Sequence, residues 1–170
     1  MKKKVCKRCE KEKQIWARGL CKSCDIVENP SKYMLERKKA EKKKKAESVT
    51  TLKKKLDAIF SLYIRQKYAD DSGNVECYTC GVVKPIKAIQ NGHFWSRSHL
   101  SVRWDEDNCR CQCSGCNVFK HGNYIVYTTK LLNEIGEEEF DKLWQKKNLL
   151  FSPTKEWLIK QIEFYTLNTK

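Results

Sequence analysis

Three histidines, four asparagines and four cysteines lie within residues 91–123, "NGHFWSRSHLSVRWDEDNCRCQCSGCNVFKHGN". An imidazole can take a proton near neutral pH, because its unperturbed pKa is about 6.5. Thiolates bind zinc, and amide oxygens suit harder ions such as Mg²⁺. The stretch therefore fits two alternatives: a zinc-stapled structural element, or a hydrolytic metal site with a zinc staple beside it.

The cysteines fall into pairs with two residues between the members of each pair. This spacing lets both sulfurs turn toward one tetrahedral ion. Near the amino terminus, eleven residues separate the first pair from the second, and this segment is too short for a core of its own. We therefore expect a structural zinc site here, and without metal the segment would be disordered. Its ligands are Cys6, Cys9, Cys21 and Cys24.

Two further pairs predict a second structural zinc site, formed by Cys77, Cys80, Cys113 and Cys116. Cys109 and Cys111 are alternative ligands for this site, but two cysteines chelate a metal better when two residues separate them than when one does. A site with four thiolates has no open coordination position. Any hydrolysis must therefore use a separate centre.

The formal charge of +14 is carried by the amino-terminal part of the chain. Residues 1–68 hold 22 Lys and Arg against 8 Asp and Glu, whereas residues 69–170 hold 13 of each. This excess predicts a polyanionic partner, and DNA is the leading candidate. The alternative is a solvated lysine-rich helix that only maintains solubility. The predicted DNA-binding side chains are Lys38, Lys39, Lys42, Lys43, Lys44, Lys45, Lys53, Lys54, Lys55, Arg97 and Arg103.

The role of the ten cysteines depends on the cellular compartment of the protein, because disulfides form mainly outside the cytosol. No apolar segment typical of a secretory signal follows the first lysines, and no run approaches the ~20 apolar residues of a membrane span. We therefore expect an intracellular protein without a membrane partner, whose paired cysteines bind metal and do not form disulfides.

Hydrophobic periodicity predicts an α+β protein. A helical pattern runs from Pro30 to about Ala69, and its apolar face begins at Leu52. Residues 75–78, 88–94 and 102–104 can form strands, residues 114–120 can begin a helix, and three more helical patterns follow. The expected order is a zinc module (1–29), a basic helical arm (30–70), a core with the second zinc site (71–123) and a helical segment (124–170).

The core stretch resembles a known family. The Gly-His pair, the Asn-Cys after an acidic turn, and Cys-x2-Cys-Asn resemble the HNH, or ββα-metal, nuclease motif with its zinc staple. More narrowly, "GHFWSR…RWDEDNCRCQCSGCN…GN" resembles the phage NinG recombination nucleases. The resemblance implies a small zinc-stapled ββα-metal core with flanking helices and an amino-terminal four-cysteine module.

The resemblance also implies three catalytic residues. His93 matches the general base that takes a proton from the attacking water, and Asn108 matches the asparagine that holds the loop and the His93 ring in orientation. Asn117 matches the helix residue that coordinates a catalytic Mg²⁺ or Mn²⁺. His121 is a further candidate ligand if the helix continues for one more turn; otherwise it is a surface residue.

The sequence departs from the motif at Gly92, where an aspartate that ligates the metal often precedes the histidine. NinG proteins also have glycine there, often with an acidic residue shortly before it, but this chain has Gln90 and Asn91. The carboxylate ligand is therefore unassigned. It could come from Asp105, Glu106 or Asp107, or main-chain groups and water could complete the shell.

By resemblance, the predicted activity is structure-specific cleavage of branched recombination intermediates such as D-loops and Holliday junctions, by metal-dependent phosphodiester hydrolysis. The alternative is a non-catalytic, zinc-containing DNA-binding accessory protein of recombination. We also expect a homodimer, because junction nucleases often cut two strands, and a cytoplasmic location in the host cell of a phage.

Overall fold

The computed structural model describes residues 3–169, and the side chains of residues 40–46 lie outside this description. The chain divides into two compact units, Met1–Glu47 and Ser48–Lys170. The division falls within the range 30–70 that the sequence assigned to one basic arm. Helix α2 (Pro30–Ala46) belongs to the first unit and helix α3 (Val49–Lys67) to the second. The hydroxyl of Ser48 accepts a hydrogen bond from Thr51 N and so caps α3.

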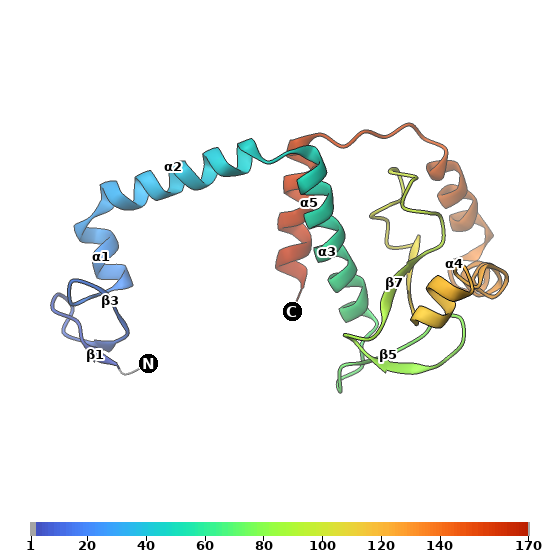
Figure 1. Ribbon diagram of the computed structural model, residues 1–170, viewed down its shortest axis with the longest axis horizontal. Helices are drawn as coiled ribbons and strands as arrows, with labels where there is room; N and C mark the ends of the chain where they lie inside the picture. Colours follow the sequence, from blue (N-terminus) through green and yellow to red (C-terminus); the bar gives the residue numbers. More distant parts are fainter. Residues whose placement is uncertain (1–2, 170) are drawn as a thin grey trace. The chain divides into compact units, whose positions relative to one another are not determined.

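The amino-terminal unit begins as a small module of short strands and a helix (Figure 1), and four of its cysteines cluster together. Its buried core consists of Leu20 and three cysteines, a cluster too small to offset the entropy of ordering the chain. A hydrogen-bonded network around the fully buried Asp25 connects the module to α2: Asp25 accepts from Arg18, Asn29 and Tyr33. The elements before α2 are β1 (Lys4–Val5), β2 (Glu12–Lys13), β3 (Ile15–Ala17), β4 (Leu20–Cys21) and α1 (Lys22–Glu28), with β1–β2 and β3–β4 antiparallel.

The carboxyl-terminal unit combines helices with short antiparallel strand pairs. Strand β5 pairs with β6, and β7 pairs with β8, with Gly92 opposite Arg110 and His93 opposite Cys109. A short π-helical turn, η1, begins at Gly115, shortly after β8 ends at Gln112. After α3 the elements are β5 (Asn74–Glu76), β6 (Val83–Pro85), β7 (Gln90–His93), β8 (Cys109–Gln112), η1 (Gly115–Phe119), α4 (Tyr124–Lys147) and α5 (Lys155–Asn168).

Two hydrophobic clusters hold the β7–β8 pair between helices (Figure 1). The first joins the apolar face of α3 to α5 and to the buried cysteines of β8. Leu52, Leu56, Phe60 and Ile64 of α3 are all buried, so the periodicity that begins at Leu52 correctly predicted the docked face. The second cluster joins Phe94 and Val102 to the inner face of α4. Helix α4 is kinked at Gly136, so two of the three helical patterns expected in residues 124–170 form one kinked helix.

The prediction of a strand at 102–104 was wrong. Val102 lies in a turn within the long loop between β7 and β8, where it is buried against α4. The strand that pairs with β7 is instead Cys109–Gln112. All four of its residues are buried, so it lacks the alternation of apolar and polar residues that marks a half-exposed strand.

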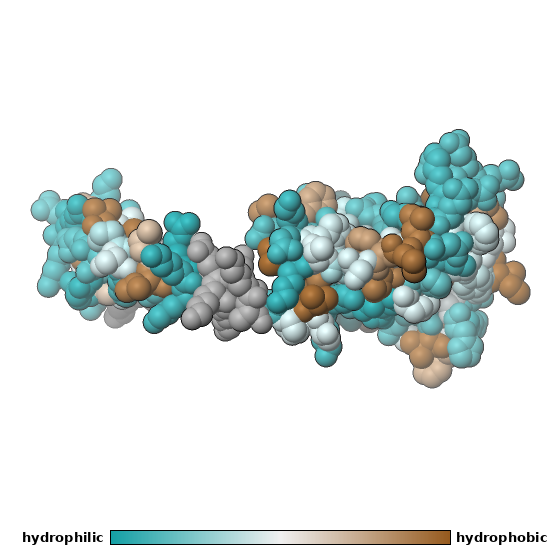
Figure 2. Space-filling model, turned by 90° about the horizontal axis from the view of Figure 1, so that it is seen from above, coloured by the Kyte–Doolittle hydropathy of each residue, from teal (hydrophilic) through white to brown (hydrophobic). Residues whose placement is uncertain are grey.

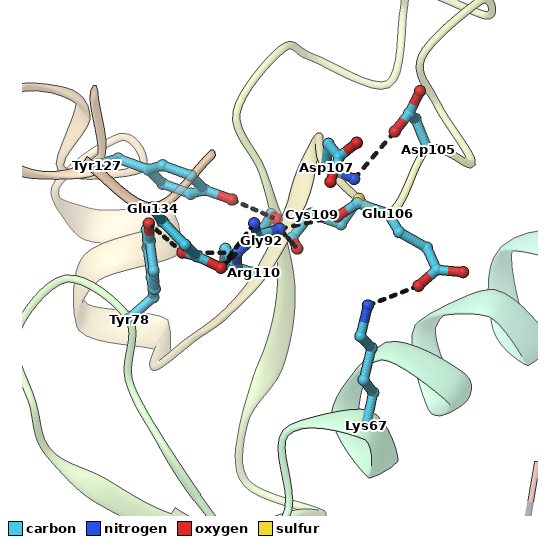
Figure 3. A network of polar contacts seen from close by, with 10 residues as sticks. All are labelled: Lys67, Tyr78, Gly92, Asp105, Glu106, Asp107, Cys109, Arg110, Tyr127 and Glu134. Carbon is cyan, nitrogen blue, oxygen red and sulfur yellow. Dashed lines mark hydrogen bonds and ion pairs between the residues drawn. The ribbon is translucent and has the colours of Figure 1, made fainter. Parts of the chain in front are cut away.

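Polar contacts hold the acidic turn that precedes β8 (Figure 3). The buried Arg110 side chain pairs with Glu134 of α4 and donates to the carbonyl of Glu106. Glu106 itself pairs with Lys67 of α3, and Asp105 pairs with Lys146 of α4. The two acidic side chains of this turn that form ion pairs therefore point to α3 and α4.

Figure 2 shows mostly hydrophilic residues on the visible face of the amino-terminal unit. Within the described part of the chain, we find no helix with the length and apolar composition needed to cross a lipid bilayer.

Candidate active site

The first cysteine cluster has the geometry of a zinc site. The sulfurs of Cys6, Cys9, Cys21 and Cys24 all lie within 4.8 Å of one another. Four sulfurs arranged tetrahedrally at a Zn–S distance of about 2.3 Å are separated by roughly 3.8 Å, and the Cys9 and Cys21 sulfurs are 3.9 Å apart. The main-chain N–H of Cys21 donates to the Cys6 sulfur, as expected for a thiolate ligand. This cluster can hold one zinc ion.

The second cluster has the same geometry and joins the β5–β6 turn to η1. Its sulfurs belong to Cys77, Cys80, Cys113 and Cys116 and also lie within 4.8 Å of one another, with 3.8 Å between those of Cys80 and Cys113. Gly81 has φ 76°, which allows its N–H to reach back to the Cys77 carbonyl. Cys109 and Cys111, the rival ligands, are buried in β8 outside the cluster. A zinc ion held here would fix the start of η1.

A cleft of about 410 Å³ lies beside this second cluster, between α3, β7 and η1. His93 and Asn117, two of the predicted catalytic residues, both line it, as does the exposed Arg97. Arg65 of α3 lines the opposite wall and is held there by a hydrogen bond that it donates to the Ile86 carbonyl. Two guanidinium groups therefore border a polar cleft, which favours an anionic ligand.

His93 is the last residue of β7, and its ring is oriented by the main chain. Its Nε2 atom lies 3.0 Å from the carbonyl oxygen of Arg103. Since a carbonyl can only accept, we assign the proton to Nε2, which leaves the lone pair on Nδ1. Burial lowers the pKa of His93 to about 4, and the positive charge of Arg97 acts in the same direction. The ring is thus neutral at pH 7 and has a nitrogen that can accept a proton.

Asn108 is fully buried and holds the loop that carries the Arg103 carbonyl. Its Oδ1 accepts from Trp95 N at 2.7 Å, and its Nδ2 donates to the carbonyls of Trp95 and Val102 at 2.9 Å each. These bonds connect the two ends of the loop between β7 and β8. An asparagine satisfies them because its amide both accepts and donates.

Neutral amide groups gather on the cleft wall near Asn117. The Asn117 side chain extends from η1 and donates from Nδ2 to Gln90 Oε1 at 2.7 Å. Asn91 also lines the cleft; it is only 6% exposed, and its Oδ1 has no hydrogen-bond partner. This set supplies oxygen donors of the kind that hard divalent ions prefer.

The carboxylate in the cleft comes from a residue that the sequence analysis did not select. Asp57 of α3 lines the cleft, and none of the three acidic candidates Asp105, Glu106 and Asp107 does so among the described residues. The sequence shows Asp57 only as one charged residue in an amphipathic helix, 36 positions before His93. No local spacing could have identified it.

The predicted DNA-binding residues lie in different environments. Lys38 and Lys39 are exposed on α2, Lys54 and Lys55 are exposed on α3, and Lys53 is half-buried. Lys42, Lys43, Lys44 and Lys45 lie outside the residues whose side chains are described. Arg103 is engaged within the protein, because its guanidinium forms an ion pair with Asp57. His121 lies in an exposed turn after η1 and does not line the cleft, so the chain leaves the helix before this residue.

Gly92 has a structural explanation. A β-carbon at this position would lie 2.3 Å from Gln112 Oε1. Gln112 cannot readily move aside, since it is fully buried and its Nε2 donates to Gly122 O and to Thr79 Oγ1. An aspartate before His93 therefore does not fit in this protein.

We expect Gly92→Ala to destabilise the carboxyl-terminal unit by about 1–3 kcal/mol, the usual range for overpacking. Urea unfolding of the zinc-loaded protein measures the change. Gly115→Ala is the matched control, because its β-carbon would meet the nearest atom at an ordinary 3.6 Å. Equal stability of the two variants would contradict the proposed clash.

Comparison with known proteins assigns the family. The family model described as "Bacteriophage Lambda NinG protein" matches residues 1–170, and the chain belongs to this family. It is similar to Protein ninG of Escherichia phage 933W, with 29% identity over 86 residues, 51% of this chain and 41% of that protein. Protein ninG of Escherichia phage lambda is 27% identical over 86 residues, 51% of this chain and 40% of that protein.

Protein ninG of Salmonella phage P22 is 27% identical over 81 residues, 48% of this chain and 38% of that protein. The matched segments thus span about two fifths of the length of these relatives. No solved structure matches the chain.

Proposed function

We propose that this protein is a divalent-metal-dependent DNA endonuclease that hydrolyses phosphodiester bonds in branched recombination intermediates. The observation that carries the proposal is the neutral His93 ring, which is held at Nε2 by the Arg103 carbonyl and lines a cleft bordered by Arg97 and Arg65. The preference for branched DNA comes from the family resemblance and not from a residue in the cleft.

The arrangement of elements supports an HNH-like, ββα-metal core. Strands β7 and β8 pair, a long loop joins them, and η1 follows with its start at a four-cysteine cluster. His93 ends the first strand, Asn108 immediately precedes the second, and Asn117 lies on η1. This order of base, loop organiser and amide donor is the one that the nuclease motif requires.

The reaction follows from these groups. Arg97 and Arg65 attract the scissile phosphate to the cleft. The Nδ1 atom of His93 takes a proton from water, the water oxygen attacks phosphorus, and the bond from phosphorus to the 3′-oxygen breaks. Asn117, with the oxygens of Gln90 and Asn91 nearby, would hold Mg²⁺ or Mn²⁺. The bound ion would stabilise the negative charge that develops on the phosphate and the leaving oxygen.

The lysines of the first unit and of α3 fit a role in tracking phosphates without reading bases. Lys38, Lys39 and Lys54 are solvent-exposed, as phosphate contacts require. The dimer and the cytoplasmic location remain predictions. Sedimentation at the monomer mass, both with and without junction DNA, would contradict the dimer.

The test is cleavage of a labelled four-way junction beside a linear duplex of matched sequence. We expect the zinc-loaded protein to cut the junction with Mg²⁺ or Mn²⁺, and to bind it without cutting when no such ion is added. Binding of the junction with no cutting under any divalent ion would favour the alternative, a non-catalytic zinc-containing DNA-binding protein.

The pH dependence of cutting gives a separate prediction. Only the neutral ring can take the proton, and its pKa of about 4 lies well below the ordinary value of 6.5. Between pH 7.5 and about 5.5 the ring therefore stays neutral, and the cleavage rate should not fall for this reason. Junction-cleavage rates at constant ionic strength, with DNA binding measured at each pH, check this. A half-loss of rate near pH 6.5 would contradict it.

A further inference from the structure

The His93 ring depends on one main-chain carbonyl, that of Arg103. This carbonyl belongs to the long loop between β7 and β8, which has no strand partner at this point. Asn108 holds the loop at Trp95 and Val102, one residue before Arg103. A carbonyl at the next position can still rotate with its own peptide unless Arg103 is held as well.

The side chain of Arg103 supplies this restraint. Its Nε donates to Asp57 Oδ1 at 2.9 Å, and its Nη2 donates to Asp57 Oδ2 at 2.6 Å. Its Nη1 donates to the carbonyl of Arg97 at 3.0 Å. A planar guanidinium bound in two places to one carboxylate has little freedom left. The contacts of the Arg103 side chain thus restrain the rotation of the Arg103 peptide unit.

Asp57 is itself rigidly placed. It lies on α3 beside Leu56, which is fully buried, and one turn before Phe60, which is 1% exposed. Trp104 Nε1 also donates to Asp57 Oδ1, at 2.9 Å. Both carboxylate oxygens therefore carry donors from the loop, and the helix that presents them is anchored in the core.

We propose that Asp57 is a positioning residue for the general base. Asp57 holds the Arg103 side chain, and the Arg103 carbonyl holds the Nε2–H of His93. The His93 ring, which lines the cleft, is thereby kept in one orientation. The inference rests on the proposed nuclease function for its effect on rate, but the restraint on the ring exists whether or not DNA is cut.

A competing assignment makes Asp57 a direct ligand of the catalytic metal, because it is the single carboxylate among the described residues that line the cleft. The contacts disfavour this assignment. Three donors already bind its two oxygens, so most of the acceptor sites of this carboxylate are occupied before any cation arrives. The two assignments predict different responses to metal concentration.

The variants are Asp57→Asn, which removes the charge at nearly constant volume, and Arg103→Lys, which keeps the charge and removes the paired contact. Asp141→Asn, at an exposed position on α4, is the matched control. All are compared with the wild type as the zinc-loaded 170-residue chain. Thermal unfolding establishes that each variant is folded before it is assayed.

We expect Asp57→Asn to lower kcat for junction cleavage by about 100-fold, as a misplacement of roughly 1 Å can do, with KM nearly unchanged. Arg103→Lys should have a similar effect. The double variant should be no worse than either single variant, because both substitutions break the same connection. Additive losses in the double variant would overturn the proposal.

Nitrogen-15 NMR of the His93 ring tests the restraint without cleavage. The wild type should show a protonated Nε2 with slow exchange at pH 7. Asp57→Asn should speed that exchange or give a mixture of tautomers, and Asp141→Asn should not. An unaltered ring signal in Asp57→Asn would overturn the proposal. If Asp57→Asn also needed a higher metal concentration than the wild type to reach its half-maximal rate, Asp57 would be a metal ligand. A wild type that shows the restrained ring but never cuts would refute the nuclease function alone.

Discussion

His93→Ala should lower the rate of junction cleavage by about 10²–10⁴-fold, the range that a general base contributes. The substitution removes the imidazole that lines the cleft, but it leaves Arg97 and Arg65 in place to attract phosphate. DNA affinity should therefore stay within a few-fold of the wild type. Single-turnover cleavage and binding to the same labelled junction, with and without Mg²⁺, measure the two effects separately.

Two controls make this result specific. His99→Ala removes a histidine from the same loop but outside the cleft, and it should cut like the wild type. Added imidazole should restore part of the lost rate in His93→Ala, because the truncated side chain leaves room for it. If His93→Ala cut normally, the base assignment would fail even though the protein were a nuclease.

Loss of the first zinc site should unfold the amino-terminal module. Among the described residues its buried core consists of Leu20 and three cysteines, with Ile15 packed against it, so little apolar burial remains without the ion. Structural zinc contributes about 10–16 kcal/mol of apparent binding energy in small zinc modules. Cys9→Ser should reduce the zinc content from two ions per chain to one and abolish the dispersed NMR signals of residues 3–29. Metal analysis and NMR spectra check both.

A second substitution separates the effect of the metal from that of packing. The Cys80 side chain is exposed, so Cys80→Ser removes a ligand with little loss of burial. Cys111→Ser alters a buried thiol outside the cluster and should leave two zinc ions bound. We expect Cys80→Ser to loosen η1 and the Asn117 position, with α3 and α5 retained by their own apolar contacts. Two zinc ions per chain in Cys80→Ser would contradict the assignment of the second site.

The spacing of residues along the chain determined the parts of the site that are local. Two residues between cysteines set the bite of a chelate, and the sequence therefore selected the same eight cysteines that the structure gathers into two clusters. The three- and four-residue recurrence from Leu52 set the buried face of α3, because an α-helix has 3.6 residues per turn. His93 and Asn117 were selected by their motif, and both line one cleft.

The tertiary structure alone decided which groups surround His93. Asp57 and Arg103 are 46 positions apart and meet because α3 packs against the β7–β8 pair, a contact that no periodicity encodes. The same packing pairs Arg103 with Asp57, so this predicted DNA-binding side chain is engaged within the protein. This packing also buried strand β8 on both faces, which erased the alternation that would have predicted it. Chelation and helical period act between near neighbours in the chain, whereas burial and ion pairing depend on which distant segments meet.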